Sequence, residues 1–228
     1  MVKVYRFWTR RLDMTHDEAV RVWTEEHAPL VVSTLGDGLS KYVTNVGLPL
    51  AAEEGGPDAP PWDGVDELWL DMTVDELKDA YKEAAPALGP SEHKYLGNSQ
   101  WMLVEEIYQR DDVGRSWTIK LIEPLVRRRD QDWDTFVDYW LNQHAPLVKK
   151  TWGDGIVHYT TNKGLGNPFN WRMPEEGPPY DGIAQFHFAW TLDEYRQVVA
   201  DTADVLVPDE RAFVTSWRAV LVDEIVQK

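Results

Sequence analysis

The alternation of apolar and polar residues divides the first half of the chain into short, regular elements. The segment "VKVYRFWTR" at residues 2–10 is rich in β-branched and aromatic residues, which is typical of a strand. In "THDE", Thr15 and Glu18 form the pattern of a capping box, and apolar residues then recur at helical spacing up to Val31. This pattern predicts a helix that bends or ends around Pro29. Three further strands are expected near residues 39–46, 65–72 and 99–108, with a second helix near 74–84.

The second half of the chain repeats this pattern. "WTEEHAPLV" at Trp23–Val31 returns as "WLNQHAPLV" at Trp140–Val148, and "GDGLSKYVTN" returns as "GDGIVHYTTN". Later, "WDGVDELWL" matches "YDGIAQFHF", and "LVEEIY" matches "LVDEIV". The chain is therefore predicted to be a tandem duplication, with one repeat at residues 1–112 and another at 113–228.

The element order in each repeat is β-α-β-β-α-β, which is ferredoxin-like. A four-stranded sheet with helices on one face needs a cover on the other, and the partner repeat supplies one. We therefore expect an α+β fold in which two fused ferredoxin-like repeats pack sheet to sheet. Two long Pro/Gly-rich loops, at residues 47–64 and 163–182, are either lids or solvated connections.

Composition narrows the class of partner. The 39 acidic and 23 basic residues give a formal charge of -16, which disfavours binding to nucleic acid or to anionic membrane surfaces. No apolar run reaches the length of a membrane span, and the first residues do not form a signal peptide. The absence of cysteine excludes thiolate chemistry and suits a cytoplasmic location. Twelve Trp favour a large aromatic interior or pocket.

The motifs W-x-x-x-H-A-P-L and G-D-G-x-x-x-Y-x-x-N, each present twice, resemble those of the EthD family of the dimeric α+β barrel superfamily. That family usually builds its barrel from two chains, so the resemblance implies a fused pseudo-dimeric α+β barrel, either a monomer or a homodimer. It also implies a pocket between sheet and helices that uses a helix histidine with groups from adjacent strands. These positions correspond to His27 and His144, with Tyr42 and Tyr159.

His27 and His144 each lie four residues after a Trp on an apolar helix face, so both are expected to point inward. One interpretation is a core histidine that donates to a backbone carbonyl freed by Pro29 or Pro146. The other is a catalytic imidazole, because histidine exchanges protons near neutral pH.

The two repeats differ at further positions that carry chemistry. His158 replaces Lys41 and His187 replaces Trp69, so His144, His158 and His187 are a candidate acid/base group and the second repeat is favoured as the catalytic one. His158 and Tyr159 must face opposite sides of their strand. The histidines lie on three separate elements without metal-site spacing, so no metal is predicted.

The residues expected to line a substrate pocket in the second repeat are aromatic or carry hydrogen-bonding groups. Asn162 is more plausibly structural, and Arg172 is a cation in the second long loop. The predicted set is Trp140, Asn162, Arg172, Phe186 and Trp190.

These residues predict an enzyme that moves protons in an aromatic pocket. The leading hypothesis is a lyase or isomerase without a cofactor, of dehydratase or cyclase type. It would act on a small apolar or aromatic carbonyl compound with His144 as the general base. The alternatives are a cofactor-independent monooxygenase, or a non-catalytic protein that binds a small molecule or haem through its histidines.

Overall fold

The computed structural model describes residues 1–48, 62–169 and 180–228. Arg172 and most of both long loops lie outside these ranges. The first half contains four strands and two long helical segments: β1 (Val2–Arg10), α1 (His16–Arg21), η1 (Val22–His27), α2 (Ala28–Leu35), η2 (Gly36–Gly38), β2 (Leu39–Gly47), β3 (Gly64–Leu70), α4 (Val74–Glu92) and β4 (Leu96–Asp111).

The second half follows in the same order, except that its last strand is interrupted at Arg218 and Ala219. Its elements are β5 (Ile119–Arg127), α5 (Trp133–Tyr139), η3 (Trp140–His144), α6 (Ala145–Trp152), η4 (Gly153–Gly155), β6 (Ile156–Gly166), β7 (Gly182–Phe188), α7 (Leu192–Phe213), β8 (Val214–Trp217) and β9 (Val220–Val226).

The strands form one closed antiparallel barrel. The order is β7-β6-β4-β1-β3-β2-β9-β5, and pairing of β5 with β7 closes the ring, while β8 extends the edge of β5. The two halves join where β4 pairs with β6 and where β2 pairs with β9. The predicted α+β barrel is therefore present, and its halves are joined by continuous hydrogen-bonded edges as well as by a shared interior.

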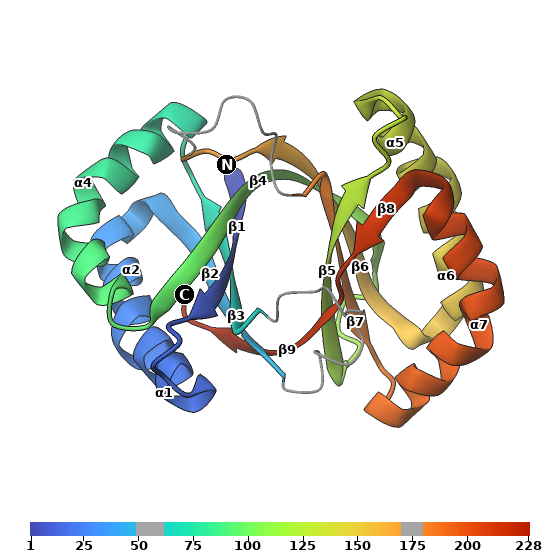
Figure 1. Cartoon of the computed structure of the whole chain (residues 1–228), viewed down its shortest axis with the longest axis horizontal. Helices are drawn as coiled ribbons and strands as arrows, with labels where there is room; N and C mark the ends of the chain where they lie inside the picture. Colours follow the sequence, from blue (N-terminus) through green and yellow to red (C-terminus); the bar gives the residue numbers. More distant parts are fainter. Residues whose placement is uncertain (49–61, 170–179) are drawn as a thin grey trace.

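The helices cover the outside of this barrel on opposite sides (Figure 1). α1, α2 and α4 lie against the strands of the first half, and α5, α6 and α7 lie against those of the second. Each strand therefore has one face toward the barrel interior and one face toward its helices. On β1, Tyr5 and Phe7 belong to the interior cluster, whereas Val4 and Trp8 pack in clusters with helix residues.

The helix predicted to bend or end at Pro29 instead continues to Leu35. A π-helical segment, η1, widens the turn before the proline, and the N–H of Ala28 donates to the carbonyl of Trp23 five residues earlier. The second half has the same insertion at η3. In such a π segment a backbone N–H bonds to the carbonyl five residues earlier instead of four, so the helix accommodates the proline without breaking.

Two other elements are longer than predicted. α4 contains two prolines and continues past Ala84 to Glu92. Leu88 and Ser91, in this additional part of the helix, are buried. β4 reaches Asp111 because its first part pairs with β1 and its second part pairs with β6 of the other half. Within the described residues, no helix is both long enough and apolar enough to cross a membrane.

Candidate functional site

The helix-facing side of the first half encloses a small cavity of about 20 Å³, room for about one water molecule. Most of its walls are aliphatic or aromatic, and the rest are ionisable. Its polar lining consists of Arg6 from β1, His27 from η1, Tyr42 from β2, Asp66 from β3, and Tyr81 and Glu92 from α4. This is the position that the family resemblance predicts for a pocket.

Asp66 lies at the centre of this polar group. One carboxylate oxygen accepts hydrogen bonds from the Tyr42 hydroxyl at 2.5 Å and from the Trp23 indole at 2.9 Å. The other oxygen has no hydrogen-bond partner among the described residues and lies 3.9 Å from the Arg6 guanidinium. Burial raises the pKa of Asp66 to about 6, although Arg6 and the two donors oppose the rise.

Arg6 is buried and only partly satisfied. Its Nη1 pairs with Glu92 at 2.9 Å, and the guanidinium stacks over the ring of Trp101. Its Nε and Nη2 have no partner in the described part of the chain. A buried donor without a partner is costly, so these N–H groups require an acceptor such as the oxygen of a water molecule or of a ligand.

His27 is 1% exposed and its Nδ1 has no partner among the residues described. Burial, reinforced by the positive charge of Arg6, lowers its pKa to about 3. The imidazole is therefore neutral at physiological pH. It lines the pocket, with its Nε2 3.9 Å from Glu92, and no hydrogen bond from it to a carbonyl freed by Pro29 occurs among the described residues.

The second half has lost the central residues of this group. In the register of the repeat, Ala184 stands where the first half has Asp66, and Glu123 stands where it has Arg6. Trp140 Nε1 and Tyr159 Oη, the counterparts of the two donors to Asp66, consequently have no hydrogen-bond partner among the described residues. Burial and then Glu123 raise the pKa of Tyr159.

His144 has a partner that the sequence did not predict. Its Nδ1 lies 2.6 Å from the carboxylate of Asp209 on α7, which also accepts from the Tyr139 hydroxyl at 2.8 Å. Burial lowers the pKa of His144, while Asp209 opposes the shift. His144 packs on Phe213 and does not line the larger cavity of this half.

His158 and His187 lie apart from His144, inside the barrel. Their rings are 5.3 Å apart at nearly a right angle, and both line an interior cavity of about 240 Å³. His158 contacts Asp111 at 2.7 Å, and His187 lies 3.6 Å from Glu224. Burial lowers the pKa of His187. The predicted three-histidine group is therefore split by the sheet, because strand neighbours face opposite sides: Tyr159 lies on the helix side and His158 in the interior.

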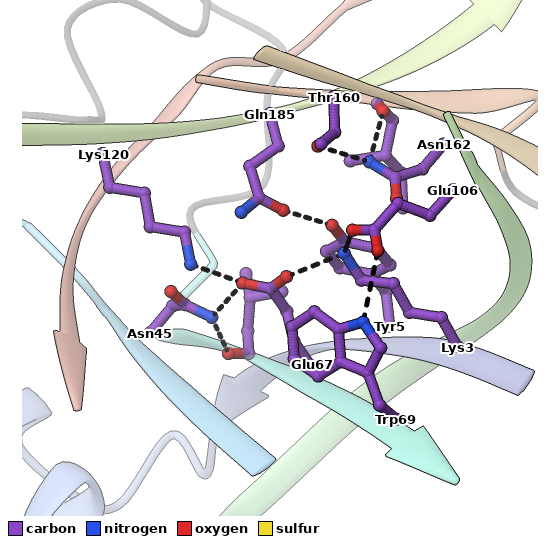
Figure 2. A network of polar contacts seen from close by, with 12 residues as sticks. Lys3, Tyr5, Asn45, Glu67, Trp69, Glu106, Lys120, Thr160, Asn162 and Gln185 are labelled. Carbon is purple, nitrogen blue, oxygen red and sulfur yellow. Dashed lines mark hydrogen bonds and ion pairs between the residues drawn. The ribbon is translucent and has the colours of Figure 1, made fainter. Parts of the chain in front are cut away.

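Charged side chains form a network beside this interior cavity (Figure 2). Glu67 lies between Lys120 at 2.5 Å and Lys3 at 3.1 Å, and each lysine also pairs with a second carboxylate, Glu224 or Glu106. Burial alone raises the pKa of Glu67, but the two lysines hold it well below the usual range. The network is internally paired, which is typical of a structural core of charges.

The other predicted pocket residues are mainly structural. Trp140 and Phe186 are buried, and Phe186 stacks on Tyr159 with ring centroids 4.2 Å apart. Trp190 stacks on Phe188. Asn162 donates to the carbonyl of Ile183 at 3.1 Å, the structural role that the sequence favoured.

Sequence reasoning missed Arg6, Asp66 and Glu92. A signal was present in the repeat, since "WDGVDELWL" carries an acidic residue where "YDGIAQFHF" carries Ala184.

The closed barrel, its outer helices and a polar pocket beneath one helix layer define an α+β barrel protein. The EthD domain matches residues 11–99 and 128–216, most of the chain, so this protein belongs to the EthD family and carries the domain twice. A comparison with curated protein sequences finds no match.

Solved structures show the same fold at low identity. An anthrone oxidase-like protein is 12% identical with a TM-score of 0.63, over 99% of this chain and 93% of that one. A proposed monooxygenase from Lactobacillus acidophilus NCFM is 11% identical with a TM-score of 0.51, over 100% and 94%. Chlorite dismutase from Candidatus Nitrospira defluvii in complex with imidazole is 8% identical with a TM-score of 0.53, over 97% and 90%. At such identities the likeness concerns the fold alone.

Proposed function

We propose that this protein is a lyase or isomerase that works without a cofactor and transfers protons on a small apolar or aromatic carbonyl compound. The observation that carries the proposal is Asp66, a buried carboxylate with one unpartnered oxygen and a pKa raised to about 6, beside an arginine with unpartnered donors. Such a pair suits removal of a proton next to a carbonyl group.

The proposal requires the walls of the cavity of about 20 Å³ to move apart when substrate enters. Each pocket group then has a defined role. The free oxygen of Asp66 takes the proton from the carbon next to the carbonyl. The Nε and Nη2 of Arg6 donate to the enolate oxygen that develops. His27 is neutral because its pKa is about 3. It therefore forms a hydrogen bond to the substrate and does not act as the general base.

In this proposal, residues 1–112 and 113–228 are two ferredoxin-like repeats. The strand order supports it, since the first half runs β4-β1-β3-β2 and the second half runs β9-β5-β7-β6. The proposal places the catalytic pocket in the first repeat, although the sequence favoured the second. His144, held by Asp209, is the competing general base.

The second candidate function is a cofactor-independent monooxygenase. It is favoured by the names of two proteins of the same fold, one anthrone oxidase-like and one a proposed monooxygenase. The same base would form a substrate carbanion, which then reacts with oxygen. Oxygen uptake in proportion to substrate consumed supports this reading, and a Soret absorption band in the purified protein supports the haem-binding one.

The test is proton exchange in heavy water. The protein is incubated with a panel of small aryl ketones, for example 2-tetralone, and loss of the proton signal next to the carbonyl is followed by NMR. We expect catalysed exchange that rises with pH through about 6, as Asp66 ionises. Asp66→Asn, which keeps an acceptor for Tyr42 and Trp23, is expected to lower the rate about 100-fold or more and to remove this pH dependence.

A matched pair of variants decides between the repeats. His27→Gln is expected to reduce exchange while leaving the pH dependence in place, and His144→Gln is expected to reduce it much less. Full activity in Asp66→Asn, or loss of activity in His144→Gln alone, contradicts the first-repeat site.

A further inference from the structure

The second half contains a cavity of about 320 Å³ between β5 and α7. Its walls are mostly apolar or aromatic, with Trp152 from α6, Tyr195 from α7 and Trp217 from β8 among them. It is far larger than the first-half cavity, although it occupies the corresponding position in the fold. A cavity of this size and lining is suited to a small organic ligand.

Two carboxyl groups, Glu123 on β5 and Glu210 on α7, line this cavity. Among the described residues, neither has a hydrogen bond or an ion pair. Burial raises the pKa of Glu123 to about 7, and burial followed by the charge of Glu123 raises that of Glu210 to about 9. Arg196 of α7 also lines the cavity and pairs with Asp193 at 3.8 Å. Two carboxyl groups close to each other are unfavourable once both are ionised.

The first half shows what is missing. There, Glu92 occupies the place of Glu210, and Arg6 occupies the place of Glu123, with 2.9 Å between guanidinium and carboxylate. The second half has Glu210 in place of Glu92, and it has a second acid, Glu123, in place of Arg6. It therefore lacks the cation that the first strand supplies in the first half, although Arg196 of α7 lines another part of this cavity.

A neighbouring polar group is also unsatisfied. The Tyr159 side chain is fully buried, its hydroxyl has no partner among the described residues, and both Glu123 and Glu210 act on it electrostatically. This hydroxyl is independent of the acidic pair, because its counterpart Tyr42 is satisfied by Asp66. Tyr159 does not itself line the cavity, so its hydroxyl describes the surroundings of the two acids and not a contact with the ligand.

We propose that the second-half cavity binds an organic cation with an apolar body, of the arylalkylammonium class. Its ammonium group lies between Glu123 and Glu210, in the place that the guanidinium of Arg6 takes in the first half. Its apolar part lies against the aromatic and aliphatic walls, where ring faces also attract a cation. A metal ion fits less well, since no group of three metal-binding side chains occurs within the described residues.

This inference does not depend on the proposed function, because it concerns the other half of the chain and needs no turnover. The test is isothermal titration calorimetry of the full-length protein at neutral pH with 2-phenylethylammonium chloride. The neutral probe 2-phenylethanol has nearly the same shape. We expect one site per chain and a Kd for the ammonium lower by about tenfold or more than that for the alcohol.

Variants at the two acids locate the site. Glu210→Gln is expected to weaken binding of the ammonium about tenfold or more. Glu123→Arg recreates the ion pair of the first half and is expected to abolish ammonium binding while raising the melting temperature. Asp204→Asn removes the same charge from an exposed position of α7, so it controls for general attraction to this acidic protein and is expected to bind normally.

Equal affinity for the ammonium and the alcohol overturns the proposal, and so does unchanged ammonium binding in Glu210→Gln. If Glu123→Arg does not fold, the comparison of Glu210→Gln with Asp204→Asn decides the matter alone.

Discussion

At the scale of single residues, the duplication shows how two substitutions change a pocket. Replacing Asp66 by Ala184 removes the acceptor shared by a tyrosine and a tryptophan, and replacing Arg6 by Glu123 removes a cation. The first half thereby keeps a compact polar group suited to proton transfer. The second half keeps a larger cavity with surplus negative charge. Both follow from the same backbone.

Glu123 makes a testable contribution to stability. Its pKa rises from 4.5 to about 7 on folding, so the folded state binds a proton that the unfolded state releases in this window. The free energy of unfolding of the native protein should therefore fall as pH rises through it, and Glu210 extends the fall toward pH 9. Asp209 and Arg211 on α7 act on Glu210 in opposite directions, and Tyr159 on β6 faces both acids.

Glu123→Gln cannot ionise and escapes this penalty. We expect it to be more stable than the native protein by on the order of 2 kcal/mol at the alkaline end, with the difference vanishing at acid pH. Urea unfolding at a series of pH values measures this difference. For the exposed control Asp204→Asn, we expect a difference in the free energy of unfolding that does not change with pH. The same constant difference for Glu123→Gln contradicts a raised pKa of Glu123.

At the scale of elements, the sequence located the strands and helices but not their full lengths. Periodicity identifies Val2–Arg10 and the capped helix after Thr15, because those signals are local. It could not show that β4 continues to Asp111, since its final residues are fixed by pairing with β6 of the other half. The π segments were also hidden, because the histidine and proline spacing fits a bent α-helix equally well.

The same limit applies to the site. His27 was found because it lies in a repeated motif on one helix, and the structure places it in the first-half pocket. Asp66 and Arg6 were not found, because they come from separate strands and meet only when β1, β2 and β3 pair. The three histidines failed to converge because a sheet lies between His144 and the other two.

One element of the second half completes the first-half pocket. Phe169, which follows β6, lies between Tyr81 and Trp101, with ring centroids 4.3 Å and 4.9 Å away, and lines the cavity. We expect Phe169→Ala to lose about 1–3 kcal/mol of stability and to leave a space shaped for an aromatic ring. Indole should then raise the melting temperature of this variant more than that of the native protein, because the space already exists in the variant.

Differential scanning fluorimetry with and without indole makes this measurement. Leu165→Ala, at an exposed position of β6 just before Phe169, is the matched control and should show neither the loss nor the rescue. If indole stabilises Phe169→Ala no more than it stabilises the control, the ring does not close the pocket.

At the scale of the whole molecule, the barrel interior joins the halves through charge as well as through strand edges. Glu67 comes from β3 of the first half, and its two partners are Lys3 of the same half and Lys120 of the other (Figure 2). All three are buried, and each lysine has a second carboxylate partner, Glu106 for Lys3 and Glu224 for Lys120. Removing the central carboxylate breaks the ion pair of Glu67 with Lys120 between the halves and leaves each lysine with the carboxylate of its own half.

We therefore expect Glu67→Gln, which loses charge-assisted hydrogen bonds to two lysines, to lower the free energy of unfolding at neutral pH by about 1.5–3 kcal/mol. Glu105→Gln, which breaks the exposed pair with Lys163, should cost about 1 kcal/mol or less. Because folding lowers the pKa of Glu67, its contribution is full above the ordinary carboxyl range and is lost as pH falls. The gap between Glu67→Gln and the native protein should accordingly narrow on acidification. Urea unfolding followed by tryptophan fluorescence measures both effects, and equal losses for the two variants contradict a joining role for the buried network.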